Sequence, residues 1–372
     1  MPATPPPNDA LTVSVIVPAR NEESALGDCL TSLVAQQGVG FEIIVIDDHS
    51  TDRTREIASS FSGNGVVLIE APPLPDGWTG KNNAAAAGAK IARGEWLLFT
   101  DADTIHLPGS LSRSIAEAKR QKAALLSYSP EQIVKSFWEK AVMPVIFAEL
   151  AASFRPSQVS NPNSPAAAAN GQYILITREA YDAVGGHAAV AANLLEDVAF
   201  ARVVKRSGRK LFFRFGGDAV RTRMYRTFPQ LREGWTKNLV LLFPHPVRLA
   251  ALRALEFILI VASFAITIAD AFGGHPRSAI AAATLCVILY AIFLTRIRRA
   301  HFSWTANLLA LFGLPLFSHL LMRSKLFHNR GIVSWKGRQY PGNQKFTEPA
   351  KEPAKEPDTT SQEKHGLSHA QS

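Results

Sequence analysis

The chain has 372 residues, 47% of them hydrophobic, and carries a formal net charge of +9. This length allows one large domain or two, and no DNA- or RNA-binding motif accompanies the positive charge, so nucleic acid is not an expected partner. The apolar residues are unevenly spread, because residues 11–245 are patterned as a soluble α/β domain and residues 246–330 as a membrane region. We therefore attribute the excess of Lys and Arg to contact with anionic lipid head groups.

The two ends of the chain are expected to be disordered. Residues 1–10 are polar and Pro-rich, and the C-terminal segment 331–372 becomes charged and repetitive from about residue 342, where "EPAK" recurs. The two cysteines, Cys29 and Cys286, are too few for a disulfide framework or a metal cluster. Their scarcity favours a catalytic domain that faces the cytosol.

Strands and helices alternate in the first hundred residues. Strands are predicted at 11–19, 41–48, 65–71 and 95–103, and helices at 21–37, 50–61 and 81–93, the first with Asn21 near its N-cap. The strands are nearly continuous in Val, Ile and Leu, which is typical of a parallel sheet with helices on both faces. Ligands of such sheets bind at the carboxyl ends of the strands, where the sequence places Asp47, Asp48, Asp101 and Asp103.

The middle of the chain is less regular. Residues 131–154 have helical spacing, with a bend expected at Pro144, and belong either to the core or to the membrane surface. Residues 193–208 read as an acidic loop that leads into a helix, and residues 210–216 as a last strand.

Three apolar segments follow, and two or three of them are predicted to span or re-enter a membrane. Residues 278–295 and 302–322 contain no Asp, Glu, Lys or Arg and are long enough to span the bilayer, whereas 254–272 is weaker because it contains Glu256 and Asp270. Basic residues lie before the first segment and after the second. The positive-inside rule therefore predicts that the start of the first segment and the end of the second both face the cytosol, so that the two segments form a hairpin. Basic residues also follow the third segment, which is therefore expected to be re-entrant or interfacial, with a break at Pro315.

Asp101 and Asp103 are the first candidates for a functional site. Two acids in such a pattern can simply form a turn or cap a helix. At the end of a buried parallel strand, however, they project into the ligand cleft, and hard divalent cations prefer carboxylate and phosphate oxygens. A diphosphate leaving group needs such a cation because its negative charge grows as the bond to the sugar breaks.

Four further acidic or basic residues have both a structural and a functional interpretation. Asp48 either caps a helix or accepts hydrogen bonds from a nucleotide base or ribose. Lys81 lies in an ordinary Gly/Pro loop or binds an anion beside a helix N-terminus. Glu196 and Asp197 are either a pair favoured by the helix dipole or, beside the Asp-x-Asp motif, the source of a general base.

A basic stretch precedes the membrane region. It is interpreted either as an interfacial belt of Trp and Arg or as a phosphate-neutralising group in which Arg232 or Lys237 acts. Its members are Arg221, Arg223, Arg226, Arg232, Trp235 and Lys237.

Taken together, five segments resemble the family-two inverting glycosyltransferases, which have the GT-A fold. They are "VSVIVPARNEE", "IIVIDDHSTD", "GEWLLFTDAD", "NGQYILITREAYDAVGG" and "LLEDVAFARVVKRSG", in family order over about residues 12–240. The stretches "PDGWTGKNNA" and "REGWTKN" further resemble membrane glycosyltransferases that act on carotenoids, hopanoid-pathway lipids and similar lipids. The resemblance implies a GT-A domain over residues 11–245, followed by membrane helices.

The resemblance also implies roles for individual residues. The segment Pro18–Glu22, which includes Arg20, and Asp48 would hold the nucleotide. Asp101 would contact the nucleotide sugar and share with Asp103 the binding of Mg²⁺ or Mn²⁺. Asp197, beside Glu196, would deprotonate the acceptor, so that a single displacement inverts the anomeric centre. The remaining substrate-binding candidates are Lys81, Arg232, Trp235 and Lys237.

The function expected from the sequence is therefore transfer of one sugar from a nucleotide-diphosphate sugar to a lipid acceptor. A UDP-sugar is the first candidate for the donor. The enzyme would be a multi-pass protein of the inner cell membrane with its catalytic domain in the cytoplasm. The alternatives are a polyprenyl-phosphate sugar synthase, a processive polysaccharide synthase and a silent nucleotide-sugar-binding protein. Processive synthases carry Gln-x-x-Arg-Trp, and the spacing of Gln230, Arg232 and Trp235 differs from it.

Overall fold

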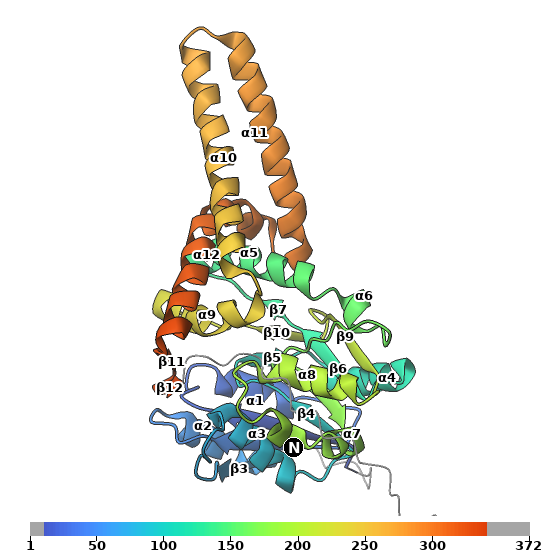
Figure 1. The fold of residues 1–372 in the computed structure, drawn as a ribbon. Helices are drawn as coiled ribbons and strands as arrows, with labels where there is room; N and C mark the ends of the chain where they lie inside the picture. The colour runs from blue at the N-terminus through green and yellow to red at the C-terminus, as the bar shows by residue number, and fades with distance from the viewer. Residues whose placement is uncertain (1–10, 341–372) are drawn as a thin grey trace, which may run out of the picture.

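The computed structural model describes residues 11–340. The disorder expected for residues 1–10 and from about residue 342 lies outside the described residues. The described chain forms an α/β domain, a layer of long helices above it and a helical hairpin that projects from this layer (Figure 1).

A seven-stranded sheet forms the centre of the α/β domain, in the order β3-β2-β1-β4-β8-β6-β9. Its pairs are parallel except where β8 lies antiparallel to β4 and to β6. The predicted, mostly parallel sheet is thus confirmed, with β8 as an inverted strand. The strands are β1 (Val13–Ala19), β2 (Phe41–Asp47), β3 (Val66–Glu70), β4 (Trp96–Phe99), β6 (Leu125–Ser129), β8 (Ile174–Thr177) and β9 (Leu211–Phe215).

Helices cover both faces of this sheet. Alternate residues of a strand point to opposite faces, so Ile16 belongs to one hydrophobic cluster and Val15 and Val17 to the other. The first cluster includes residues of α3 and α8, and the second includes residues of α1 and α4. The covering helices are α1 (Leu26–Val34), α2 (Thr54–Ser60), α3 (Gly80–Ile91), α4 (Ser110–Gln121), α7 (Arg178–Ala183) and α8 (Glu196–Arg206), with short 3-10 turns η1 (Ser62–Asn64) and η2 (Gly186–Val190).

The first helix begins later than predicted, at Leu26, and Asn21 does not cap it. Asn21 instead has a positive φ of 51°, and its backbone N–H donates to Ser50. The backbone N–H of Glu22 donates to Thr54. Residues after β1 are thus held against the loop after β2, because their polar groups find partners there rather than in a helix.

A second, three-stranded sheet lies next to the carboxyl end of β4. It contains β5 (Thr104–His106), β10 (Val220–Thr222) and β7 (Glu131–Gln132), in the order β5-β10-β7. Because β5 starts directly after Asp103, this sheet fixes the position of the loop that carries both acids of the Asp-x-Asp motif.

Three helices form the layer above the sheets: α5 (Phe137–Ser153), α9 (Phe228–Leu242) and α12 (Trp304–Arg330), with α6 (Pro156–Val159) beside them. Both α5 and α12 continue through their proline, so the break expected at Pro315 is absent. Gly313 of α12 lies against α5 so closely that a Cβ there would come 1.9 Å from the carbonyl oxygen of Ala141. The third apolar segment therefore packs along the catalytic domain as one continuous helix.

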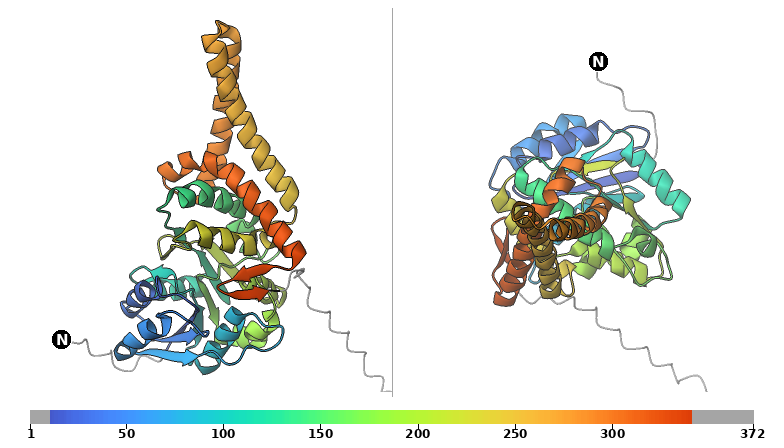
Figure 2. Two further views of the ribbon diagram at one scale, coloured as in Figure 1. Left: turned by 90° about the vertical axis from the view of Figure 1, so that its left-hand side faces the viewer. Right: turned by 90° about the horizontal axis from the view of Figure 1, so that it is seen from above.

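The first two apolar segments form the predicted hairpin, α10 (Pro246–Phe272) and α11 (Pro276–Ile297), followed by η3 (Arg298–Ala300). It projects away from the domain in Figures 1 and 2. The helices α10, α11 with η3, and α12 are all long and apolar enough to cross a membrane, but α12 is half buried within the protein. At the base of the hairpin, an ion-pair network joins it to α5 through Glu149, Arg253, Glu256 and Arg296.

The described chain ends in a small β-hairpin, β11 (Val333–Trp335) and β12 (Arg338–Tyr340), which follows α12 directly. Figure 2 shows it returning from the layer of long helices to the side of the α/β domain.

Candidate active site

A cavity of about 730 Å³ lies at the carboxyl ends of β1, β2 and β4. At one end it is lined by acids and bases from the α/β domain. At the other end it is lined by apolar side chains from α5, α9 and β9, and by the residues at the base of the hairpin α10–α11. The cavity thus joins a charged region to an apolar one, which borders the base of the candidate membrane helices at residues 299–301. Nearly all the site residues predicted from the sequence line it: Pro18, Arg20, Glu22, Asp48, Lys81, Asp101, Asp103, Glu196, Asp197, Trp235 and Lys237.

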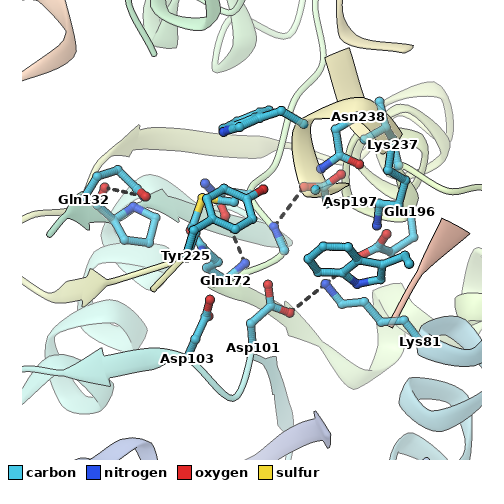
Figure 3. A pocket seen from close by; sticks show the side chains of 18 of the residues that line it. Lys81, Asp101, Asp103, Gln132, Gln172, Glu196, Asp197, Tyr225, Lys237 and Asn238 are labelled. Atoms are coloured by element: carbon cyan, nitrogen blue, oxygen red, sulfur yellow. Dashed lines mark hydrogen bonds and ion pairs between the residues drawn. The ribbon is translucent and has the colours of Figure 1, made fainter. Parts of the chain in front are cut away.

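Lys81 bridges two of the predicted acids, and Figure 3 shows its contact with Asp101. Its Nζ atom lies 2.6 Å from Asp101 Oδ1 and 2.6 Å from Glu196 Oε1. Burial alone would lower the pKa of Lys81, but the charges of these two carboxylates hold it well above its usual value. The same ammonium lowers the pKa of Glu196 against the effect of burial. Lys81 and Glu196 therefore stay charged at neutral pH.

Asp197 lies at the start of α8, with its carboxylate held by two backbone amides. The N–H of Gly171 donates to Oδ2 at 3.0 Å and that of Val198 to Oδ1 at 2.7 Å. Burial and the neighbouring charge of Glu196 nevertheless raise the pKa of Asp197 to about 6. A carboxylate with this pKa is ionised at pH 7 and is basic enough to accept a proton.

The glycine of the "NGQY" segment, Gly171, lies beside the ion pair of Lys81 and Glu196. A Cβ at this position would come 2.9 Å from Lys81 Nζ and 3.3 Å from Glu196 Oε1. A side chain there would make the ends of Lys81 and Glu196 shift, so glycine lets the loop before β8 border this ion pair without disturbing it.

The surroundings of the Asp103 carboxylate are those of a cation ligand. Its Oδ1 atom is buried and has no hydrogen-bond partner within residues 11–340. Burial and the charges of Asp101 and Glu22 raise the pKa of Asp103 to about 7. No group of three or more His, Cys, Asp or Glu residues within the described chain is arranged to hold a metal ion alone. The acids present therefore fit a divalent cation whose remaining ligands come from a bound phosphate.

Asp48 and Glu22 already have partners in this structure, and both partners come from the C-terminal hairpin. Arg338 holds the two carboxylate oxygens of Asp48, with Nη2 2.8 Å from Oδ1 and Nη1 against Oδ2. Lys336 Nζ contacts Glu22 and donates to the backbone oxygen of Arg20 at 2.9 Å. Glu22 has a raised pKa because burial outweighs the contact with Lys336.

The basic residues before the membrane region do not all lie in one place, because some line the cavity and others are exposed on the surface. Arg232 is exposed on α9 and does not line the cavity, so the structure separates it from the predicted phosphate site. Lys237 lines the cavity and lies 5.3 Å above the ring of Trp335. Burial lowers the pKa of Lys237, although the charge of Glu196 opposes this effect.

Trp235 is a packed residue rather than part of an exposed interfacial belt. It is 2% exposed, and its indole N–H donates to the sulfur of Met143 at 3.3 Å. Gly234 beside it leaves room for Tyr225, whose ring atoms a Cβ would approach to 2.5 Å. The "REGW" segment thus fits α9 closely against α5 and the wall of the cavity.

The sequence prediction did not include the residues of the hairpin β11–β12 that line the cavity, which are Trp335, Lys336, Gly337, Arg338 and Tyr340. The sequence offers only a weak hairpin signal here, because Gly337 suits a two-residue turn but Lys336 is not among the residues favoured before it. Nothing in the sequence places this turn beside acids that precede it by about 300 residues.

Comparison with known proteins identifies a matching family and several relatives. Residues 14–185 match the family described as Glycosyl transferase family 2. The 4,4'-diaponeurosporenoate glycosyltransferase of Staphylococcus aureus (strain USA300) is 29% identical over 341 residues, which cover 88% of each chain. The mannosyltransferase PcManGT from Pyrobaculum calidifontis, solved with GDP-Man and Mn²⁺, overlays with a TM-score of 0.49 at 17% identity, over 88% of this chain and 89% of that one. S. aureus TarS overlays with a TM-score of 0.44 at 18% identity, over 64% of this chain and 40% of that one.

The domain match covers the strands β1, β2 and β4 that carry the acidic end of the cavity, and the relative extends over most of the chain. The mostly parallel α/β sheet agrees with the GT-A-like fold expected from the sequence. The protein is therefore a glycosyltransferase with a GT-A-like α/β domain, in which residues 14–185 form a glycosyl transferase family 2 domain.

Proposed function

We propose that the enzyme transfers a single sugar from a nucleotide-diphosphate sugar to a lipid acceptor, with inversion, at the cytoplasmic face of the membrane. The observation that carries this proposal is the continuity of the cavity. It extends from the acids after β4 to apolar side chains next to the base of α10 and α11. A polar donor and an apolar acceptor can therefore meet within one cavity.

The donor would occupy the charged end. Asp48 and the segment Pro18–Glu22 would hold the nucleotide, with a UDP-sugar as the first candidate. Asp101 and Asp103 would hold Mg²⁺ or Mn²⁺, which when bound neutralises the charge that develops on the diphosphate. Lys237, which has no carboxylate partner within 4.0 Å among the described residues, would attract a phosphate group.

The acceptor would occupy the apolar end, whose lining includes Phe147, Leu150 and Phe154. The name of the S. aureus relative identifies its substrate as a carotenoid acid, and this chain resembles it over 88% of its length. We therefore propose a long apolar lipid with a terminal hydroxyl or acid group as the acceptor.

The reaction would be a single displacement. The acceptor oxygen attacks the anomeric carbon as the bond to the diphosphate breaks, and a hydroxyl acceptor loses its proton to Asp197. An acid acceptor is already deprotonated at neutral pH and needs no base. Since one displacement occurs at one carbon, the product has the opposite anomeric configuration.

The distribution of basic residues supports the proposed orientation in the membrane. Arg248 and Arg253 lie at the start of α10, and Arg296, Arg298 and Arg299 lie at the end of α11 and in η3. Both sets lie at the base of the hairpin, next to the catalytic domain. By the positive-inside rule this base, and with it the catalytic domain, would lie in the cytoplasm.

Transfer of a radiolabelled sugar tests the proposal. The full chain in nanodiscs is supplied with UDP- or GDP-sugars, Mg²⁺ and a membrane lipid extract, and lipid-soluble label is counted. We expect a singly glycosylated lipid whose anomeric configuration, determined by NMR, is opposite to that of the donor. A retained configuration, or polymeric product, would contradict the proposal.

A further inference from the structure

The hairpin β11–β12 covers the charged end of the cavity with two cations from the far end of the described chain. Lys336 contacts Glu22, and Arg338 contacts Asp48, across sequence separations of 314 and 290 residues. The Asp48 and Arg338 side chains are only 6% and 18% exposed. The hairpin therefore makes specific contacts with the acids proposed to hold the nucleotide.

The position of the Arg338 guanidinium is a built site. A Cβ on Gly80 would lie 1.6 Å from Arg338 Nη1 and 2.4 Å from Asp48 Oδ2. The absence of a side chain at the start of α3 thus provides the space in which the guanidinium reaches Asp48. This fit distinguishes the contact from a loose surface ion pair.

The hairpin has almost no core of its own. Its strands have three residues each, joined by a two-residue turn in which Lys336 and Gly337 have φ values of 47° and 77°. Such a hairpin is only marginally stable alone, and Val333 is its one buried apolar residue among those described. It is connected to α12 through Gly331, which has a φ of 66°. The position of the hairpin therefore depends on its contacts with the acids and with α9 rather than on internal packing.

The hairpin is braced on its other side by α9. Ser334 donates to Glu233 at 3.3 Å, and the ring of Trp335 lies below the ammonium of Lys237. It thus touches both the acids of the nucleotide end and the helix that leads to the acceptor end.

We propose that β11–β12 is a gate on the donor site: Arg338 occupies the carboxylate of Asp48 in the free enzyme, and an incoming nucleotide must displace it. The gate rests on the proposed function, in which Asp48 accepts hydrogen bonds from the nucleotide. Arg338 contacts both oxygens of Asp48, and this side chain is only 6% exposed, so a nucleotide reaches the carboxylate only when the guanidinium moves away. The displaced guanidinium remains near the negative diphosphate, which lowers the cost of the exchange.

The association rate of nucleotide tests the gate. Binding of UDP and GDP with Mg²⁺ to the full chain in nanodiscs is followed by surface plasmon resonance, which separates association from dissociation. Since a hydrogen bond to a charged group must break before entry, we expect Arg338→Ala to raise the association rate constant about tenfold or more. Arg338→Lys, which keeps the charge but loses the two-pronged contact, should give a smaller increase.

Two further variants control the experiment. Gly80→Ala keeps the Arg338 side chain but puts a methyl group against both its guanidinium and Asp48 Oδ2. It should also raise the association rate, and because Asp48 is itself displaced, only the association rate of this variant is compared with that of Arg338→Ala. Gln339→Ala changes an exposed neighbour on the same strand and should leave both rates unchanged.

The outcomes distinguish the gate from the proposed function. Nucleotide binding by the wild type with an unchanged association rate in Arg338→Ala overturns the gate alone. Faster dissociation with unchanged association also overturns it, because the hairpin would then be a clamp. If no variant, including the wild type, binds either nucleotide, the proposed function fails, and the gate fails with it.

Discussion

The ammonium of Lys81, on α3, lies 2.6 Å from the carboxylate of Glu196, on α8, and the same ammonium lies 2.6 Å from Asp101. One side chain therefore connects the loop proposed to bind the donor with the helix that carries the proposed base. Two residues that are far apart in the sequence become parts of one charge network, in which a change at either end alters the other.

Replacement of Lys81 by Ala should reduce transfer at least tenfold and weaken donor binding. The change leaves Asp101 and Glu196 without their shared cation, and both acids then repel the diphosphate. Transfer rates and isothermal titration with UDP and Mg²⁺ measure the two effects. Lys90→Ala, at an exposed position near the end of the same helix, is the matched control and should change neither. Wild-type transfer by Lys81→Ala would show that the bridge is dispensable.

Replacement of Asp103 by Asn should abolish transfer without lowering stability. Burial and neighbouring negative charge raise the pKa of Asp103 to about 7, so its ionised form is disfavoured in the metal-free protein, and a neutral amide relieves this cost. Thermal unfolding in EDTA should therefore give a melting temperature equal to or above that of the wild type. A Mn²⁺ titration should stabilise the wild type in the presence of UDP but not the variant. Full activity in EDTA would contradict the assignment.

Replacement of Asp197 by Asn should distinguish the two proposed kinds of acceptor. With a hydroxyl acceptor, loss of the base should reduce transfer about 10²–10⁴-fold while donor affinity stays near that of the wild type. With an acid acceptor, transfer should fall far less. Glu196→Gln serves as the neighbouring comparison and should affect donor binding through Lys81. Loss of donor binding in Asp197→Asn would instead indicate a structural role.

The pH dependence of the wild type should agree with the same assignment. Burial and the charge of Glu196 raise the pKa of Asp197 to about 6. The charge of Lys81 and the N–H groups of Gly171 and Val198 oppose this rise. The charge of Lys237 also interacts with Asp197. Only the ionised form accepts a proton, so transfer to a hydroxyl acceptor should fall as the pH drops below about 6. The raised pKa also means that Asp197 favours folding at low pH and that this contribution is lost as the pH rises through 6. Asp197→Asn should therefore be as stable as the wild type, or more stable, at pH 7.5, as measured by thermal unfolding.

Replacement of Gly313 by Ala should destabilise the protein by about 1–3 kcal/mol, because the new methyl group overlaps the backbone of α5. The helix α12 would move away from α5, and with it the apolar wall of the cavity. Thermal unfolding in detergent measures the loss. Gly63→Ala, where a Cβ would meet no atom within 4 Å, is the control. An unchanged melting temperature for Gly313→Ala would show that the two helices separate without cost.

The α/β core and the acidic end of the site could be predicted from the sequence, because both depend on local patterns. Continuous Val, Ile and Leu runs predict buried parallel strands, and acids that follow such strands meet at one edge of the sheet. Asp48, Asp101 and Asp103 are therefore found where they were expected. Length and lack of charge predict α11 in the same way, and the basic residues on either side of the first two segments predict that the weaker α10 pairs with it as a hairpin.

Tertiary structure alone decided the partners of these residues. The exposure of Arg232, the burial of Trp235 and the bridge made by Lys81 depend on how α9, α5, α3 and α8 pack, which no local pattern specifies. The course of α12 through Pro315 depends on the surface of α5 that receives Gly313. The contact between Arg338 and Asp48 was the least predictable, because a charged residue pairs with whichever opposite charge the fold brings near, and here the fold brings it from 290 residues away.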